Sequence, residues 1–398
     1  MDTHEEQVGI FASMMTEKVA APQPKCRSLL DGGPVLPVTD TVVVAMSRAS
    51  VEEVLRNPDV FSSGKAATDL KARRPIIPMS IDPPAHRTYR KLLDPLFSPQ
   101  RMKLLEGSMT ALANELIDAF ADEDEVDFSA QFSIPFPCRV FLTMFGLPVE
   151  ELPRFLEMKD GIIRPFLVTG EPRGSEATDA YQQATADSIY EYFERLIDGR
   201  GSTRGDDMLS HFLDAEVDGD RLTGDEIVDI GFQFLIAGLD TVTAALDCFF
   251  GYLAQHPDHC KALVADPDVI PNAVEELLRW ESPVFAAERV ATRDTEVAGC
   301  PVKAGDHVLV LIGAANIDDA ELVDAGEVQF DRQVTRHLAF GGGIHRCLGS
   351  HLARLELKVA LREWHRRIPE YSLKPGAVLG YSPGIRALDA FPMLLGRS

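Results

Sequence analysis

The stretch that decides the fold is FGGGIHRCLGSHLAR, residues 340–354. Three successive glycines loosen the backbone, and the apolar spacing after them predicts an amphipathic helix with Cys347 in its first turn. The unpaired N–H groups of Leu348 and Gly349 and the helix dipole favour a thiolate at that position. A thiolate can act as a nucleophile or ligate a metal. A phosphate-binding loop is disfavoured, because no Gly-Lys-Ser/Thr follows the glycines.

Cys347 also admits a plainer interpretation, since a lone cysteine before a helix is often a small buried hydrophobic residue. The complete string is more specific. It resembles the haem-binding loop of the cytochrome P-450 family, which has Phe, two residues, Gly, one residue, Arg or His, one residue, Cys, one residue and Gly. The matching residues are Phe340, Gly343, His345, Cys347 and Gly349.

The resemblance implies that Cys347 is the axial ligand of haem iron. A cysteinate ligand donates electron density that favours O–O cleavage at the opposite face of the haem. The chain must then pass close under a flat macrocycle, which small residues allow. By the same resemblance, Phe340, Gly341 and Gly349 contact the haem, and Phe340 shields the sulfur from water.

A second motif lies in a long apolar stretch, residues 231–254, and a capping box formed by Thr223 and Glu226 precedes it. The stretch is nearly long enough to cross a membrane, but polar residues interrupt it, so we expect a buried central helix. The hydroxyl of Thr241 can donate to the carbonyl of Ala237 and distort the helix at that point.

Within this helix, Ala237, Gly238, Asp240 and Thr241 match the oxygen-activation motif of the same family, Ala/Gly-Gly-x-Asp/Glu-Thr. The resemblance implies that Asp240 and Thr241 route protons to dioxygen at the haem iron, with Ala237 against the haem. An acid and a hydroxyl side by side in an apolar helix are costly unless they have partners. A threonine that is satisfied locally and has no catalytic role is the alternative.

Glu276 and Arg279 lie one helical turn apart, between these two motifs, and can form an ion pair. Alone, such a pair carries little meaning, because most lie on solvated helix faces. In the family the pair is buried and is joined by an arginine from the loop before the cysteine, a position that Arg332 fits. The resemblance therefore gives Glu276, Arg279 and Arg332 a structural role in support of the haem loop.

Haem propionates need cations in a partly buried setting. His86 and Arg90 are spaced four residues apart, so one helix face presents both. They resemble the H-x-x-x-R pair of the family, and Arg289 and His345 fit the other usual propionate positions. For each of these residues the alternative is a surface cation.

The resemblance covers almost the whole chain from about residue 37 and implies one catalytic domain, 1–398, with a poorly defined segment at 1–36. The family fold is mainly α with a small β-rich lobe. It is a triangular prism with the haem between the oxygen-activating helix and the cysteine-ligand helix. Helical patterns dominate residues 98–279, and strand-like runs occur at residues 38–44 and 307–311.

Composition excludes several partners. The 39 basic and 62 acidic residues give a net charge of −23, which argues against nucleic acid or an anionic membrane surface. Six cysteines without a C-x-x-C pattern make disulfides and a zinc site improbable. The first residues lack an apolar leader or an arginine-rich transit pattern, so a cytoplasmic protein of bacterial type is expected.

A basic stripe crosses the predicted cysteine helix. Arg354, Lys358 and Arg362 recur every four residues, and Arg346 adds a charge beside the cysteine. The usual fate of such a run is a solvated helix face. On the proximal side of a haem, however, it could dock an acidic redox protein by electrostatic steering. The resemblance implies a ferredoxin or flavodoxin with an NAD(P)H-dependent reductase as the electron source.

The substrate pocket is the least determined part of the site. By family position, its lining comes from the residues before the His-x-x-x-Arg helix, from the central helix, and from segments after Arg279 and near the C-terminus: Ile76, Ile77, Ile236, Leu239, Val284, Phe285, Ile385 and Arg386. Most are aliphatic, which suits a small hydrophobic molecule. The chain is most similar to the camphor-hydroxylating branch, which points to a terpenoid-sized ligand by analogy.

Arg386 stands where the family has an apolar residue, and Arg73 and Arg74 precede the other pocket loop. One hypothesis is that an arginine among these three orients a carboxylate or ketone oxygen of the substrate. The alternative is that Arg386 turns outward or binds a carbonyl or a propionate.

The sequence thus predicts a monomeric haem-thiolate monooxygenase that contains haem b and uses O2 and a separate reductant to hydroxylate a small terpenoid, steroid, fatty acid or aromatic acid. Two alternatives stay open. An H2O2-dependent peroxygenase would need no proton-delivery pair, and a haem sensor or carrier would need no docking stripe.

Overall fold

The apolar stretch folds as two helices in series, α12 (Gly224–Gly238) and α13 (Thr241–Gln255), in the computed structural model, which describes residues 3–66, 70–217, 219–333 and 336–396. The predicted capping box is present: Thr223 Oγ1 accepts from the N–H of Glu226, whose carboxylate accepts from the N–H of Thr223. Residues 224–255 are apolar enough to cross a membrane, but 78% of their most apolar window is buried inside the protein. The two helices therefore form the expected buried centre of the protein.

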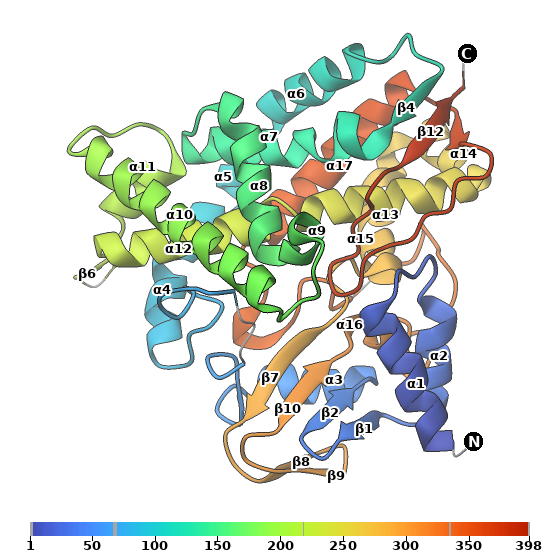
Figure 1. The fold of residues 1–398 in the computed structure, drawn as a ribbon. Coiled ribbons are helices and arrows are strands. Elements are labelled where there is room, and N and C mark those ends of the chain that lie inside the picture. Colours follow the sequence, from blue (N-terminus) through green and yellow to red (C-terminus); the bar gives the residue numbers. More distant parts are fainter. Residues whose placement is uncertain (1–2, 67–69, 218, 334–335, 397–398) are drawn as a thin grey trace.

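Most of the other helices lie around this pair, and a smaller group lies beside the strands in the lower part of the view (Figure 1). Those before α12 are α1 (Thr3–Thr16), α2 (Gln23–Asp31), α3 (Arg48–Arg56), α4 (Ala85–Leu93), α5 (Pro99–Lys103), α6 (Glu106–Asp118), α7 (Pro135–Phe145), α8 (Leu152–Ile163), α9 (Pro165–Thr169), α10 (Glu176–Arg200) and α11 (Met208–Asp214). Those after α13 are α14 (Pro257–Ala265), α15 (Ile270–Glu281), α16 (Ile312–Ala315) and α17 (Ser350–Arg367). The helical pattern predicted for residues 98–279 is confirmed.

The N-terminal segment is better ordered than the sequence pattern predicts. Helices α1 and α2 occupy most of residues 3–31, and Phe11, Met14, Cys26 and Leu29 are buried there. Expecting a poorly defined segment at 1–36 is therefore wrong for its described part. The apolar residues of α1 and α2 cover a cluster that also contains Phe285, so the segment completes a core.

The strands are short and gather into small sheets, the largest of them below the helices in Figure 1. Their bounds are β1 (Val35–Thr39), β2 (Val42–Ala45), β3 (Phe61–Ser62), β4 (Glu125–Asp127), β5 (Glu216–Val217), β6 (Asp220–Arg221), β7 (Ala287–Ala291), β8 (Thr295–Val297), β9 (Cys300–Val302), β10 (His307–Val310), β11 (Tyr371–Leu373) and β12 (Pro392–Leu395). The largest sheet has the order β1-β2-β10-β7-β3. A helix-rich fold with a small β-rich lobe is thus confirmed.

Two strand predictions have different outcomes. The run at residues 307–311 is confirmed as β10, which pairs parallel to β2 and antiparallel to β7. The run at residues 38–44 is not one strand, because the chain turns back between β1 and β2 to form an antiparallel hairpin. The N–H of Thr41 donates to Thr39 Oγ1 (3.2 Å), which stabilises this turn locally.

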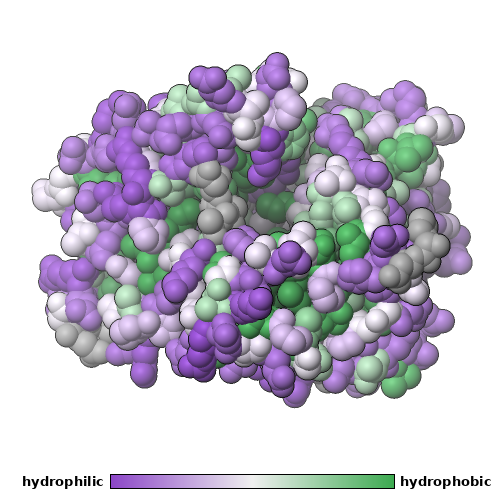
Figure 2. Space-filling view, turned by 60° about the horizontal axis from the view of Figure 1, so that its bottom comes forward, coloured by the Kyte–Doolittle hydropathy of each residue, from purple (hydrophilic) through white to green (hydrophobic). Residues whose placement is uncertain are grey.

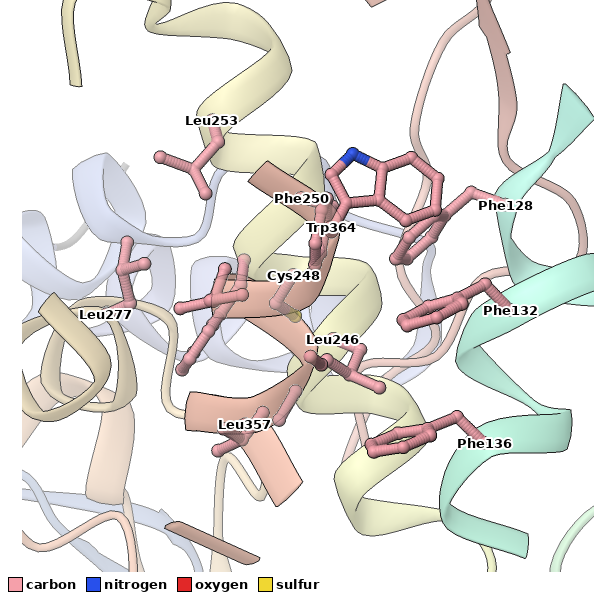
Figure 3. Close-up of a cluster of buried hydrophobic side chains, with 14 of the residues drawn as sticks. Phe128, Phe132, Phe136, Leu246, Cys248, Phe250, Leu253, Leu277, Leu357 and Trp364 are labelled. Carbon is pink, nitrogen blue, oxygen red and sulfur yellow. The ribbon is translucent and has the colours of Figure 1, made fainter. Parts of the chain in front are cut away.

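An aromatic cluster fixes α17 against the central helix. Trp364 is fully buried, and its ring centroid lies 5.0 Å from that of Phe128 and 5.2 Å from those of Phe132 and Phe250, all in edge-to-face contact. Figure 3 shows Phe128 and Phe132, from the segment before α7, and Phe136, at the start of α7, projecting toward Trp364 and α13. Each aromatic pair contributes about 0.5–1.5 kcal/mol beyond its burial. The cluster thereby sets where α17, and the loop before it, can lie.

Candidate functional site: a cysteine loop beside an anion-binding cluster

The loop that carries Cys347 depends on its glycines. Gly341 and Gly343 have φ values of +67° and +63°, a region that side chains disfavour. A Cβ on Gly343 would also lie 2.0 Å from the carbonyl oxygen of Leu55 at the end of α3. The N–H of Cys347 donates to the carbonyl of Phe340 (2.9 Å) and closes the loop. The sequence therefore permits a tight loop packed directly on α3.

Cys347 lies before the helix, not in its first turn. Helix α17 begins at Ser350. Arg346 has an extended backbone (φ −51°, ψ 136°), so the chain at the cysteine is not helical. Cys347 is exposed, whereas Cys26, Cys138, Cys248 and Cys260 are buried. Cys300 is half-buried, so Cys347 is the cysteine whose side chain is most open to a bound group.

The surroundings of Cys347 act on the thiol in opposite directions. Neighbouring residues restrict hydration of the sulfur, which raises the pKa of Cys347. The N–H of Gly349 and the positive charges of Arg90, Arg346 and Arg354 lower that pKa. The predicted stabilisation of the thiolate by a backbone N–H is therefore present at Gly349. It lowers the pKa of Cys347 by less than the loss of hydration raises it. A metal cation would complete the stabilisation of the thiolate.

Beside the loop lies a cluster of buried nitrogen atoms with unused hydrogen-bonding capacity. His86 of α4 and His345 of the loop have ring centroids 4.4 Å apart, and the Nε2 atom of each is buried without a partner in the described structure. Arg289 of β7 is 8% exposed and donates to the carbonyl of Glu288 (2.7 Å), with no carboxylate partner among the described residues. An anion with several oxygen atoms would satisfy all three side chains.

The electrostatics of this cluster favour the same kind of ligand. Burial, together with the positive charge of Arg289, lowers the pKa of His345 to about 3. Burial and the charge of Arg90 also lower the pKa of His86. Both imidazoles are therefore neutral near pH 7, and each offers one N–H donor.

The fourth expected propionate residue, Arg90, is already engaged. Its Nη1 donates to the carbonyl of Arg346 (2.8 Å) and its Nε pairs with Asp94 (2.8 Å). Arg90 therefore joins α4 to the cysteine loop. Overall, a reachable sulfur beside neutral imidazoles and an unpaired buried guanidinium fits haem, whose propionates are anions and whose iron accepts a thiolate.

A buried charge triad supports this loop, with the geometry predicted for Glu276, Arg279 and Arg332. Arg279 holds both carboxylate oxygens of Glu276 at 2.7 and 2.9 Å, and Arg332 Nε donates to Glu276 Oε1 at 3.1 Å. Glu276 and Arg279 are at most 1% exposed. Burial alone would raise the pKa of Glu276, but Arg279 and the N–H of Gln329 hold it below its ordinary value.

The triad reaches the cysteine loop through Asn316. Arg279 Nη1 donates to the carbonyl of Asn316 (3.0 Å), and Asn316 Oδ1 accepts from the N–H of Leu338 (2.6 Å), two residues before Phe340. The amide nitrogen of Asn316 donates to Ser282 Oγ (2.8 Å). Both polar atoms of the Asn316 side chain thus tie the end of α15 to the segment that leads into the loop.

The central helix is interrupted where the sequence predicts a distortion. Thr241 Oγ1 donates to the carbonyl of Ala237 (2.8 Å), α12 ends at Gly238, and α13 starts at Thr241. The side chain of Thr241 therefore replaces a backbone partner at the break. Asp240, in the break, is 1% exposed.

Two cations that the sequence motifs do not indicate neutralise Asp240. Lys159 of α8 donates to Asp240 Oδ1 (3.1 Å), and Arg164 donates to Oδ1 and Oδ2 (3.0 and 2.7 Å). Burial alone would raise the pKa of Asp240, but these two charges hold it below its ordinary value. Asp240 is therefore ionised near neutral pH. No local signal could have found the pair, because more than seventy residues separate these cations from the carboxylate.

The expected pocket residues belong to separate packing groups. Ile76, Ile77, Ile236 and Leu239 are buried in one cluster, whereas Val284 and Ile385 pair through an antiparallel bridge elsewhere. Figure 2 shows a hollow near the middle of one face, with hydrophobic residues visible inside it.

Phe285 packs apart from Ile76 and Ile236. It is 5% exposed and lies in the cluster under α1 and α2, where a Cβ on Gly313 would lie 2.1 Å from its ring. Its expected place in the pocket lining stays a prediction. Its ring fills a space that the N-terminal helices close.

Arg386 is occupied by the protein. Its guanidinium pairs with the buried Glu281, donates to the carbonyls of Glu281 (2.6 Å) and Ala20 (3.2 Å), and lies 4.5 Å from the ring centroid of Tyr381. The hypothesis that Arg386 orients a substrate is therefore wrong in this structure. The carbonyl-binding alternative describes its contacts.

The other two arginines of that hypothesis are also paired. Arg74 binds Asp229 (2.8 Å) and Asp225 (3.2 Å). Arg73 binds Asp187 (3.1 Å) and Glu194 (3.0 Å). An anionic substrate would have to displace these carboxylates.

The basic stripe is only partly available to a partner. Arg354 is held by Glu275, and Arg362 by Glu106 (3.0 Å) and Glu363 (3.1 Å), so the protein itself compensates these two charges. Their expected place on a redox-partner face stays a prediction. Arg346 is exposed and Lys358 half-buried, and neither forms an ion pair within the described ranges.

A helix-rich fold that presents one reachable cysteine beside an anion-binding cluster has the features of a haem-thiolate enzyme. Residues 35–367 match the family model described as Cytochrome P450, and the chain belongs to the cytochrome P450 family. Its relatives carry monooxygenase and hydroxylase names, and the chain is a haem-iron monooxygenase of this family.

Three relatives show the extent of the similarity. Steroid C26-monooxygenase of Mycobacterium tuberculosis (strain CDC 1551 / Oshkosh) is 34% identical over 369 residues, which cover 91% of this chain and 96% of that protein. Mycinamicin IV hydroxylase/epoxidase of Micromonospora griseorubida is 35% identical over 312 residues, covering 77% of this chain and 76% of that protein. The structure of CYP109E1 from Bacillus megaterium in complex with testosterone superposes with a TM-score of 0.83 at 29% identity, covering 94% of this chain and 99% of that one.

The charge triad yields a stability prediction. Glu276→Gln leaves Arg279 and Arg332 buried with too little negative charge, so we expect the free energy of unfolding to fall by about 3–5 kcal/mol. Chemical denaturation followed by circular dichroism measures it. The control is Glu52→Gln, whose carboxylate pairs with Arg48 and Arg56 on the surface of α3 and should contribute at most about 1 kcal/mol. Equal losses in the two variants would contradict the assigned role.

Proposed function

We propose that this monooxygenase binds haem b through Cys347 and hydroxylates a neutral, compact hydrophobic molecule. The carrying observation is the exposed sulfur in a glycine-dependent loop beside buried His86 and Arg289 and half-buried His345, whose nitrogen atoms have unused hydrogen-bonding capacity. His86, His345 and Arg289 would hold the propionates, with Arg90 in support. Phe340, Gly341, Gly349 and Ala237 would contact the macrocycle.

The haem would supply the activation of O2, so that one oxygen atom enters a C–H bond and the other leaves as water. The protein must then deliver protons without admitting bulk water to the pocket. Thr241 lies at the break in the central helix, and its oxygen has lone pairs left to accept a hydrogen bond while its hydrogen is on Ala237. Asp240 is ionised between Lys159 and Arg164, so it can take up a proton only by exchanging one of these partners.

This assignment predicts a specific defect in Thr241→Ala. Without the hydroxyl, reducing equivalents should be consumed with little product, because protons no longer arrive in order. Asp240→Asn should lower turnover by about 100-fold or more, within the range of general acid–base catalysis. Product formed per NAD(P)H oxidised, with a ferredoxin and reductase supplied, is the measurement.

The matched control for this prediction is Thr243→Ala. Thr243 is a buried hydroxyl two residues further along the same helix and donates to the carbonyl of Leu239 (3.3 Å) rather than to that of Ala237. Its coupling should stay at the parent level. An uncoupled Thr243→Ala, or a fully coupled Thr241→Ala, would contradict the proton-delivery role. Turnover with H2O2 and no reductant would favour the peroxygenase alternative.

The substrate proposal rests on charge. Arg73, Arg74 and Arg386 are each paired with protein carboxylates, so no arginine of the expected pocket is available for an anionic group. The aliphatic residues Ile76 and Ile77 favour an uncharged ligand. Two relatives are named for steroids, one as a steroid monooxygenase and one in complex with testosterone. We therefore favour neutral steroid or terpenoid molecules over fatty and aromatic acids.

A spectral titration of the ferric protein tests this choice. Testosterone and neutral terpenoids should give a saturable shift toward high spin, because they displace water near the haem. Fatty acids and small aromatic acids of similar size should give none. A shift with the acids alone would contradict the proposal and would favour Arg74 as the residue that orients the substrate.

Electrons would come from a ferredoxin or flavodoxin and an NAD(P)H-dependent reductase. Arg346 and Lys358 supply positive charge for docking on a chain whose net charge is −23. We further propose a single catalytic domain that acts as a monomer in the cytoplasm.

A further inference from the structure

A second polar network lies next to the charge triad, and the cytochrome P450 motifs do not account for it. Arg354 Nε and Nη2 donate to the two carboxylate oxygens of Glu275 at 2.7 and 2.8 Å. His337 Nε2 lies 3.1 Å from Glu275 Oε2. Glu275 belongs to α15 and Arg354 to α17, so this bidentate pair joins the two helices directly.

The network makes contact with the cysteine loop. The guanidinium carbon of Arg354 lies 4.4 Å from the ring centroid of Phe340, in a cation–π arrangement. The ring of His337 is 5.8 Å from that of Phe340. Phe340 in turn accepts the N–H of Cys347 at its carbonyl (2.9 Å). Arg354 therefore contacts Phe340, and Phe340 is hydrogen-bonded to Cys347, the proposed iron ligand.

The charges of the network are balanced. His337 Nδ1 accepts from the N–H of Ala339 (3.2 Å), so the ring proton sits on Nε2 and donates to Glu275. Burial lowers the pKa of His337 and keeps the ring neutral. Burial alone would raise the pKa of Glu275, but His337 and Arg354 bring it to about 2. One negative charge therefore faces one positive charge.

We propose that Glu275 and Arg354 are positioning residues that set the reduction potential of the haem bound at Cys347. Arg354 seats Phe340 and directs a positive charge at the sulfur, and Glu275 limits the reach of that charge. The inference rests on the proposed haem ligation. Reduction of the iron adds one electron to the site, so net positive charge nearby favours the reduced form and net negative charge opposes it. Side-chain exposures of 20% and 26% leave both charges only partly screened.

Equilibrium redox titration of the haem-loaded protein tests the proposal. Glu275→Gln keeps the shape of the side chain and leaves Arg354 unbalanced, so the potential should shift positive. Arg354→Met keeps an apolar stem on Phe340 and leaves Glu275 unbalanced, so the potential should shift negative. The double variant should return close to the parent value, because the pair is then removed together.

Opposite signs separate this role from a merely structural one. If the two residues only hold the loop, both single variants admit water and shift the potential in the same direction, and that result overturns the proposal. Unmoved potentials overturn it as well. Should Arg354→Met not retain haem, Glu275→Gln decides alone, since a negative or absent shift contradicts the balance of charges.

The chain offers matched controls on the same helix. Arg362 of α17 pairs with Glu106 at 3.0 Å, two turns beyond Arg354. Arg362→Met and Glu106→Gln make the same chemical changes away from Phe340 and should leave the potential at the parent value; a shift as large as that of the test pair would overturn the proposal. A parent protein without the spectrum of thiolate-ligated haem would overturn the proposed function itself. A normal parent with unmoved variants would overturn this inference alone.

Discussion

The carboxylate of Glu276 is the point on which the rest of the site depends, because it is buried and both cations that neutralise it bring chain segments with them. Arg279 also donates to the carbonyls of Asn316, Ala325 and Glu327. Arg332 donates to the carbonyls of Val323 and Asp324. One buried charge thereby gathers the irregular segment ahead of the cysteine loop, which has few strands or helices of its own to define it. Removing any of the three leaves a charge that the interior cannot solvate.

Around this point, charged side chains are paired with opposite charges, and nitrogen atoms without partners lie where a ligand is expected. Asp240 lies between Lys159 and Arg164, and Arg386 meets Glu281. Among the described residues, the Nε2 atoms of His86 and His345 beside the loop have no hydrogen-bond partner, and Arg289 has no carboxylate partner. Since buried polar groups without partners are rare in folded proteins, their concentration in one place indicates an anion rather than a defect of packing.

Motifs with local spacing could be predicted from the sequence, and contacts between distant segments could not. The break at Thr241, the pair of Glu276 with Arg279 and the helix-rich fold follow from neighbours in the chain. The start of α17 could not be predicted, because the extended backbone at Arg346 has no signal in residue type. The ion pairs of Arg354 and Arg386 could not be predicted either. Both look like available cations in the sequence, yet each is bound by a glutamate brought from another segment.

The claim that Cys347 is the axial ligand is tested most directly by the absorption spectrum of the reduced, carbon monoxide-bound protein. The parent should show the red-shifted Soret band of a thiolate-ligated haem. Cys347→Ser should lose that band while the fold, followed by circular dichroism, is retained. A parent spectrum typical of imidazole ligation, or a thiolate spectrum that persists in Cys347→Ser, would contradict the account.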